Sequence, residues 1–265
     1  MPFLRSSLLV AISLVISFSI LGQKATYIAN SGVLIQVGSN KVLIDAFFSD
    51  GKGRFMTPEG SQLDAMVNGK PPYNNLSLAL ATHAHPDHFS PDQIGKLLSV
   101  NKKLKLLATP HTVDSIEAAI DNFEVIHDRT LTFPLSRSWK TYSQEGMTVK
   151  AAYAKHAGKS NARVQGLIYL VNFNGKKILH LGDADMDTNR FAELKLEYEE
   201  VDIAFVPFWY LTNFYGVEFI SQNISAKIVV AVHIPENYNQ QSLDKIKKFM
   251  PQAVLFQNAG QSIFF

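Results

Sequence analysis

Three histidines and an aspartate stand together within six residues of this chain, as His83, His85, Asp87 and His88. They come directly after the apolar run Leu76–Ala81, which ends abruptly. Such a run is typical of a buried strand, and its carboxyl end would present all four side chains in one small volume. A single histidine is more often a hydrogen-bonded structural residue, but three with an aspartate at one strand end indicate a metal site.

The spacing of these residues indicates how the ligands would divide between two ions. His83 and His85 lie two residues apart in extended chain, so their side chains can point the same way and chelate one ion. Pro86 then turns the chain, which lets Asp87 and His88 reach a second ion about 3.5–4 Å away, the separation found in two-metal hydrolytic sites. Nitrogen and oxygen ligands suit Zn²⁺, with Mn²⁺ and Fe²⁺ as alternatives.

The pattern H-x-H-x-D-H resembles the signature of the metallo-β-lactamase superfamily, and the resemblance covers nearly all of the chain after residue 22. It implies an α/β fold, namely a four-layer αββα sandwich. The metals of this family lie at one edge of the sandwich, between the two sheets. The family also requires three further ligands downstream of the motif.

The sequence offers two of these ligands as histidines that follow predicted strands. His156 leaves the run Met147–Tyr153 into a glycine-containing loop, where the family places the third ligand of the first ion. His233 follows the run Ile228–Val232 and would complete the second ion's set with the aspartate and the last histidine of the motif.

The remaining ligand implied by the resemblance is Asp183, the carboxylate that bridges both ions. It follows Gly182, whose missing side chain lets the backbone approach closely. Asp185 and Asp187 are near enough to compete, but they are better interpreted as acids at the start of the helix predicted over Arg190–Leu196. True β-lactamases of the superfamily have Cys or Ser at the bridging position, so this aspartate argues against a β-lactam substrate.

The charge of the assembled site indicates hydrolysis. Two divalent ions outweigh Asp87, Asp183 and a bridging hydroxide, so a net positive charge would face the substrate. We therefore expect both aspartates to be catalytic, and the second oxygen of Asp87 is free to orient the hydroxide or to shuttle a proton. His85 supports this reading, since the oxygen-reducing diiron branch of the superfamily has Glu there.

The substrate class follows from the branch that the pattern resembles. It is similar to the short lactonase and phosphodiesterase members, including the ascorbate-6-phosphate lactonase type, which implies a small-molecule ester, lactone or phosphodiester. The alternative is a catalytically inactive protein of the same fold that binds or scavenges metal.

Several other residues have roles that the sequence leaves open. Asp45 could orient a metal ligand from behind or cap a turn, and His180 could support the site but is favoured as a packed residue. Lys159 and Arg163 could contact an anionic substrate or be solvated loop cations. Trp209 could line an apolar pocket or pack in the core.

The order of the remaining segments predicts a sandwich. We expect an opening meander from three strands, a helix from Ser90 to about Val100 with Ser90 as its side-chain cap, and a second sheet that begins at Leu131–Phe133. The long stretch Phe47–Asn75 is a candidate lid or pocket wall. The other predicted strands are Ala25–Ile28, Val33–Val37, Lys41–Ile44, Leu104–Ala108, Ser138–Tyr142, Gly166–Phe173, Lys176–Leu181, Asp202–Val206 and Ile263–Phe265, and the other predicted helices are Thr112–Ile120 and Leu243–Met250.

The first 22 residues have the pattern of a secretory signal, and residues 23–265 then form one hydrolase domain. Arg5 precedes the apolar run Leu8–Leu21, which is short for a membrane span and suits the central region of a signal peptide. An uncleaved anchor is the alternative. With no cysteine there is no lipoprotein site, disulfide or thiolate ligand. A net charge of +2 gives no argument for nucleic acid or a membrane surface. From the pattern of the leader we expect an exported, periplasmic or secreted protein.

This pattern predicts that the leader is removed during export. Mass spectrometry of the protein recovered from cell fractions is expected to find a new N-terminus near Gln23 in the exported fraction. Intact Met1 on protein from the soluble cytoplasmic fraction would contradict the prediction.

Overall fold

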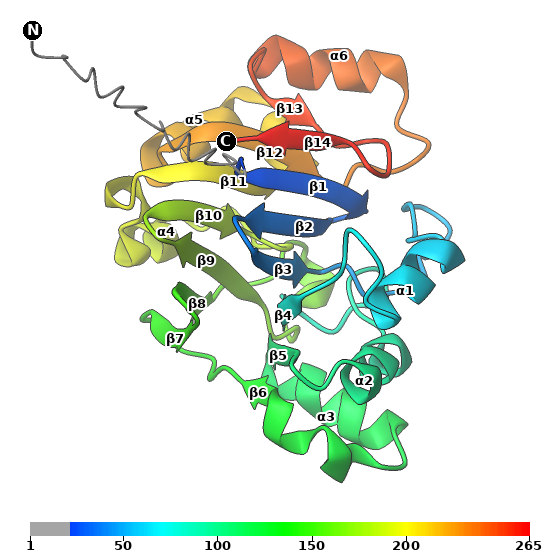
Figure 1. The fold of residues 1–265 in the computed structure, drawn as a ribbon. Coiled ribbons are helices and arrows are strands. Elements are labelled where there is room, and N and C mark those ends of the chain that lie inside the picture. The colour runs from blue at the N-terminus through cyan, green and yellow to red at the C-terminus, as the bar shows by residue number, and fades with distance from the viewer. Residues whose placement is uncertain (1–21) are drawn as a thin grey trace, which may run out of the picture.

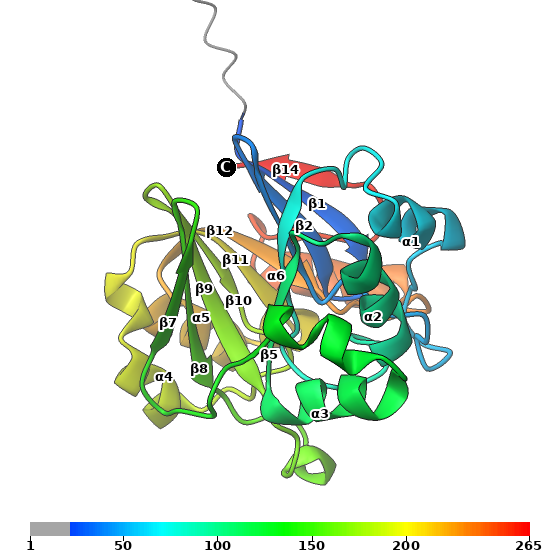
Figure 2. The same cartoon turned by 60° about the horizontal axis from the view of Figure 1, so that its bottom comes forward.

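Two seven-stranded sheets lie face to face, and helices cover the outer side of each (Figures 1 and 2). The structure is a computed structural model that describes residues 22–265, so the predicted signal peptide falls almost wholly outside the described residues. The arrangement confirms the four-layer αββα sandwich expected from the sequence. Within residues 22–265, no helix has the length and apolar character that crossing a membrane requires.

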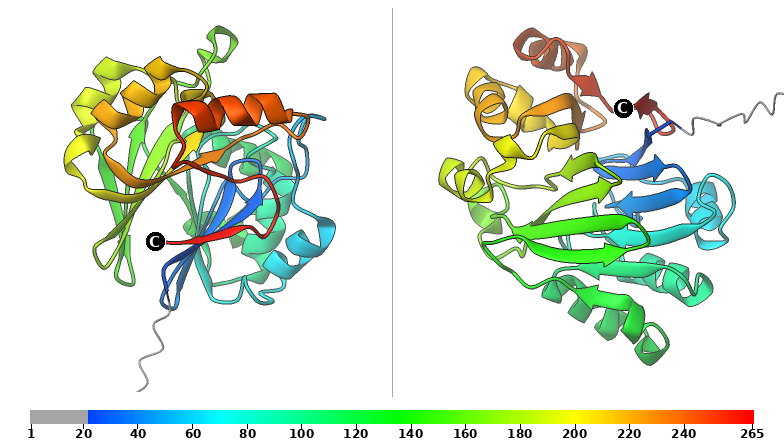
Figure 3. Two further views of the ribbon diagram at one scale, coloured as in Figure 1. Left: turned by 90° about the horizontal axis from the view of Figure 1, so that it is seen from above. Right: turned by 60° about the vertical axis from the view of Figure 1, so that its left-hand side comes forward.

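The first sheet combines an antiparallel opening with a parallel half. Its strand order is β14-β1-β2-β3-β4-β5-β6, and pairing from β3 to β6 is parallel. Three helices that follow β3, β4 and β5 cover its outer face (Figure 3). These elements are β1 (Lys24–Ala29), β2 (Gly32–Val37), β3 (Asn40–Ile44), α1 (Gly60–Val67), β4 (Leu76–Leu80), α2 (Pro91–Val100), β5 (Lys105–Ala108), α3 (Pro110–Ala119), β6 (Thr130–Thr132) and β14 (Ser262–Phe264).

The second sheet mirrors this plan, with strand order β13-β12-β11-β10-β9-β8-β7. Its strands β7 to β10 pair antiparallel and β10 to β13 pair parallel. These elements are β7 (Lys140–Gln144), β8 (Met147–Tyr153), β9 (Leu167–Phe173), β10 (Lys176–His180), α4 (Thr188–Leu194), β11 (Val201–Pro207), α5 (Phe214–Asn223), β12 (Ala226–Val232), α6 (Gln240–Phe249) and β13 (Val254–Leu255).

Three apolar layers hold the sandwich together. The central layer lies between the sheets and is built from inward-facing strand residues such as Ile44, Leu78, Val149 and Phe205. The outer layers join each sheet to its helices. Strands buried on both faces need nearly continuous apolar sequence, which explains why β4 and β11 are apolar except for Ser77 and Asp202.

Two expectations about the elements were wrong, and some elements were not anticipated. β6 pairs with β5 and belongs to the first sheet, because Leu106 opposes Thr130 in a parallel ladder. The stretch Phe47–Asn75, expected as a lid or pocket wall, contains the helix α1. The helix α5 and the strand β13 were not anticipated. Ser90 does stand at the start of α2, but its side chain makes no capping hydrogen bond.

One buried side chain ties the two sheets together behind the metal-binding motif. The hydroxyl of Tyr169, on β9, donates to the Ala81 carbonyl at 2.9 Å and lies 3.1 Å from the Leu107 carbonyl. Tyr169 is fully buried and Ala81 immediately precedes Thr82 and His83. The contact therefore fixes the end of β4 against the second sheet.

Removing this hydroxyl is expected to destabilise the fold. Tyr169→Phe should lower the free energy of unfolding by about 1–3 kcal/mol, because a buried carbonyl loses its donor. Tyr198→Phe is the matched control, since Tyr198 is 76% exposed; its change should stay within about 0.5 kcal/mol. Denaturant unfolding measures both, and equal effects would show that the Tyr169 contact contributes nothing.

Candidate metal centre

All seven predicted ligand residues meet at the end of the sandwich where β4, β8, β10 and β12 finish. Two groups of ligand atoms together contain all seven, and within each group the atoms lie within 4.8 Å of one another; a third such group, Asp45 with His83 and His88, overlaps both. The first group contains His83, His85, His156 and Asp183, and the second contains Asp87, His88 and His233.

Asp183 lies between the two groups and contacts both. Its Oδ2 is 3.4 Å from His156 Nε2 and 3.2 Å from His233 Nε2, while its Oδ1 is 3.3 Å from His88 Nε2. It is 8% exposed. No other carboxylate among the described residues contacts histidines from both groups in this way.

The backbone before Asp183 is shaped to place this carboxylate. Gly182 has φ +52°, and a Cβ there would come within 2.7 Å of the Thr82 side chain, so a larger residue does not fit. The amide of Gly182 donates to Nδ1 of His180 at 3.1 Å, and Nε2 of His180 faces the Ser31 carbonyl at 2.9 Å. His180 is thus fully buried, as favoured from the sequence, and it also holds the turn that carries Asp183.

The contacts of Asp45 show that it supports a metal-ligand candidate, which is one of the two roles that the sequence left open. Its Oδ2 accepts from the Thr82 hydroxyl at 2.6 Å and lies 2.9 Å from Nδ1 of His88, and its Oδ1 accepts from the Thr82 amide at 2.7 Å. Holding Nδ1 of His88 leaves Nε2 of that ring pointing into the cluster. Asp45 therefore orients His88, in the way that carboxylates behind metal-bound histidines do.

In this cluster the carboxylates and imidazoles shift one another's pKa values. Burial alone would lower the pKa of His88, but Asp183 and Asp45 outweigh it and raise that pKa well above its usual value. The pKa of His233 is raised in the same way, against its burial, chiefly by Asp183. Conversely, burial and the neighbouring histidines lower the pKa of His85 to about 4. Three buried carboxylates, Asp45, Asp87 and Asp183, thus draw positive charge onto the nearest imidazoles.

The donor set fits divalent ions better than it fits an internal hydrogen-bond network. Nε2 of His88, Nε2 of His233 and Oδ1 of Asp183 are buried and make no hydrogen bond. Such atoms are costly when left unpaired. They face one another across the cluster, as ligands around a common centre do, and the nitrogen and oxygen atoms are the types that Zn²⁺, Mn²⁺ and Fe²⁺ accept.

A turn in the segment 47–58 forms one wall of the site and brings two residues that the sequence did not point to. Lys52 Nζ lies 3.0 Å from Oδ1 of Asp87. The rings of Phe55 and Trp209 both pack edge-on against His233, with ring centroids 4.2 Å and 5.3 Å from that of His233. The expectation that Asp87 keeps a free second oxygen was wrong, because Lys52 pairs with it.

Several other histidines and charged residues lie away from the cluster. His111 is exposed at the start of α3, and His127 pairs with Asp128 on the surface. Lys159 and Arg163 are exposed and make no ion pair among the described residues. Asp187 is the cap of α4 and accepts from the Arg190 amide at 3.0 Å, which agrees with its predicted place at a helix start.

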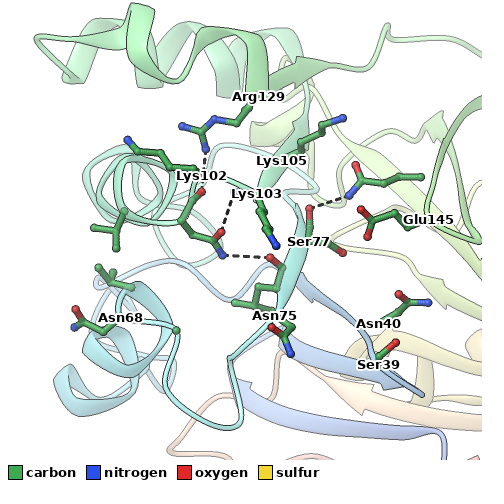
Figure 4. A pocket seen from close by; sticks show the side chains of 16 residues that line it. Ser39, Asn40, Asn68, Asn75, Ser77, Lys102, Lys103, Lys105, Arg129 and Glu145 are labelled. Atoms are coloured by element: carbon green, nitrogen blue, oxygen red, sulfur yellow. Dashed lines mark hydrogen bonds between the residues drawn. The ribbon is translucent and has the colours of Figure 1, made fainter.

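One groove of the surface is separate from the metal-binding residues. It has a volume of about 850 Å³ and lies where β4 and β5 begin, at the opposite end of these strands from the cluster (Figure 4). Lys102, Lys105 and Arg129 surround it, and no histidine or aspartate lines it. Glu145 is the one carboxylate that lines it, so the groove lacks the grouped histidines and aspartates of the cluster.

Comparison with known proteins places the chain in a family. Residues 24–233 match the model of the β-lactamase superfamily domain. The chain belongs to this family. The match confirms the resemblance drawn from the motif and the fold that it implied, and with them the expectation of a metal-dependent hydrolase of the metallo-β-lactamase fold.

Solved structures with the same fold are distant in sequence. The possible metal-dependent hydrolase of Veillonella parvula DSM 2008 has a TM-score of 0.64 at 15% identity, covering 92% of this chain and 100% of that one. An isothiocyanate hydrolase from Delia radicum gut bacteria has a TM-score of 0.64 at 14% identity, covering 91% and 99%. The diiron β-hydroxylase CmlA from Streptomyces venezuelae has a TM-score of 0.60 at 13% identity, covering 92% and 54%.

The placement of Asp183 between the two ligand groups leads to a prediction on metal content. After saturation with Zn²⁺ and removal of the excess, the wild-type protein is expected to retain close to two ions and Asp183→Ala at most one. The loss follows because a shared anion no longer offsets the repulsion between two dications. Elemental analysis of the folded proteins measures this.

Asp187→Ala is the matched control, because it removes a nearby acid that caps a helix. It should keep both ions and lose about 0.5–2 kcal/mol of stability in thermal or denaturant unfolding. If Asp187→Ala, and not Asp183→Ala, lost metal, the assignment of the shared ligand would be refuted.

Proposed function

We propose that this protein is a hydrolase that uses two divalent ions, with Zn²⁺ preferred, to cleave a small-molecule ester, lactone or phosphodiester. The observation that carries the proposal is the position of Asp183, whose two oxygens contact histidines of both ligand groups. A single-ion site would not need a carboxylate placed between two complete sets of ligands.

The residues of the cluster would hold the two ions as two sets of ligands. His83, His85 and His156 would hold the first ion, and Asp87, His88 and His233 the second, with Asp183 shared. Bound there, the two ions would supply a bridging hydroxide at neutral pH and polarise the oxygen of the scissile group. Asp45 would keep the His88 ring in place, and Phe55 and Trp209 would exclude water from the His233 side.

The two other readings of the site are less well supported. A diiron oxidase, suggested by the fold neighbour CmlA, is disfavoured by the neutral nitrogen ligand His85, where the oxygen-reducing branch of the superfamily has a carboxylate. A protein that only scavenges metal would need metal ligands and nothing more. Here Lys52, Phe55 and Trp209 lie next to the ligand residues, and they are residues that a substrate would contact. Export to the periplasm or medium remains part of this proposal.

The test is a hydrolysis screen of lactones, aryl esters and phosphodiesters with Zn²⁺-loaded, Mn²⁺-loaded and metal-free protein. At least one class is expected to be cleaved, and a chelator should abolish the cleavage. His85→Ala should lower kcat/KM at least a hundredfold for that substrate, because the first ion loses one of its three nitrogens.

The control is His111→Ala, which removes an exposed histidine from the start of α3 and should change kcat/KM less than twofold. Activity that survives chelation, or a His85→Ala variant as active as the His111→Ala variant, would contradict a metal-dependent reaction at this cluster.

A further inference from the structure

Lys52 stands on a turn that is fixed at several points around the metal-binding residues. The amides of Arg54 and Phe55 both donate to the Gly51 carbonyl at 3.0 Å, which closes the turn. A Cβ on Gly51 would lie 1.9 Å from the Phe55 carbonyl oxygen, so the turn requires glycine there. Lys52 itself has φ +53°, and its amide donates to the Asp50 side chain at 2.7 Å.

Contacts on both flanks anchor this turn to the ligand-bearing loops. Before the turn, the Phe47 carbonyl accepts from the Ser90 amide at 2.7 Å, two residues after His88. After the turn, the Arg54 carbonyl accepts from the Glu236 amide at 3.0 Å, three residues after His233. The segment is thus a wall tied to the second ligand group, and the position of Lys52 is set by the fold.

The contact with Asp87 does not occupy all the N–H donors of the Lys52 ammonium group. An ammonium has three N–H donors, and the only carboxylate within 4 Å of Lys52 Nζ among the described residues is that of Asp87. The Lys52 side chain is 41% exposed, whereas that of Asp87 is 5% exposed. The ammonium therefore bridges the buried cluster and the solvent at its mouth, with donors left for a ligand.

A cation at this place favours a negatively charged ligand. The rings of Phe55 and Trp209 pack against His233, whose Nε2 lies 3.4 Å from Oδ2 of Asp87, and neither ring carries charge. A ligand with one anionic group next to an apolar body matches these neighbours.

We propose that Lys52 is the anion-binding residue of the site and selects substrates that carry a carboxylate or phosphate group beside the scissile bond. This inference rests on the proposed function, because it names the substrate class for that same cluster. The anchoring contact with Asp87 holds the ammonium in position, and its remaining donors bind the anionic group.

The experiment measures binding of inorganic phosphate by calorimetry, using Zn²⁺-loaded protein dialysed free of excess metal. Lys52→Met, which keeps the apolar stem and removes the charge, is expected to weaken phosphate binding at least tenfold while the ion content stays unchanged. Lys52→Arg should stay within about threefold of the wild type. Lys102→Met, the same change in the distant groove of Figure 4, should leave phosphate binding unaltered.

Two results would overturn the inference. Phosphate affinity of Lys52→Met within twofold of the wild type would show that Lys52 binds no anion. Loss of an ion from Lys52→Met would show that Lys52 acts by positioning Asp87 instead. The ion count of the wild type reports separately on the proposed function: a wild type that retains at most one ion contradicts the dinuclear site, and the phosphate comparison still decides the role of Lys52.

Discussion

The burial of three carboxylates at one end of the sandwich is the constraint on which the site depends. Asp45, Asp87 and Asp183 are each less than 9% exposed and lie within one cluster of imidazoles. Buried charge of one sign is costly unless opposite charge is brought in. The protein alone answers this with one ammonium and with raised pKa values at His88 and His233. Divalent ions would balance the carboxylate charge without protonation of the imidazoles, so the imidazole nitrogens would be free to act as ligands.

Left-handed backbone also occurs where these groups are positioned. Asp45 has φ +48°, Gly182 has φ +52° and His233 has φ +63°, and each directly follows or nearly follows a strand of the central core. A left-handed residue of this kind turns the chain sharply at the end of its strand. The cost of such conformations is of order 1–3 kcal/mol each for residues other than glycine. The rigid strands behind them, packed in a continuous apolar layer, supply the stability that tolerates this strain.

How far the sequence predicted this arrangement depends on the range of each interaction. Alternating and nearly continuous apolar runs located most strands, because a buried strand must itself be made of apolar residues. All seven candidate ligands are indeed brought together, since each follows a strand and the strands end on one side. Three features depend on contacts between residues 24 to 43 positions apart. They are the pairing of β6 with β5, the contact of Asp45 with His88 and the contact of Lys52 with Asp87. No local pattern carries that information. Lys52 had only the glycines on either side of it as a signal.

Chemistry and selectivity come from different parts of this fold. The seven ligand residues follow strands whose geometry the two sheets impose, so any chain with this fold and motif presents much the same cluster. The groups at its mouth come from elsewhere: Lys52 and Phe55 from a turn between β3 and α1, and Trp209 from the short 3₁₀ helix Phe208–Leu211 after β11. Loops such as these accept substitutions without disturbing the sheets. The ligand residues thus come from strand ends that the fold imposes, whereas the residues around them come from loops: Lys52 contacts Asp87, and Phe55 and Trp209 pack against His233.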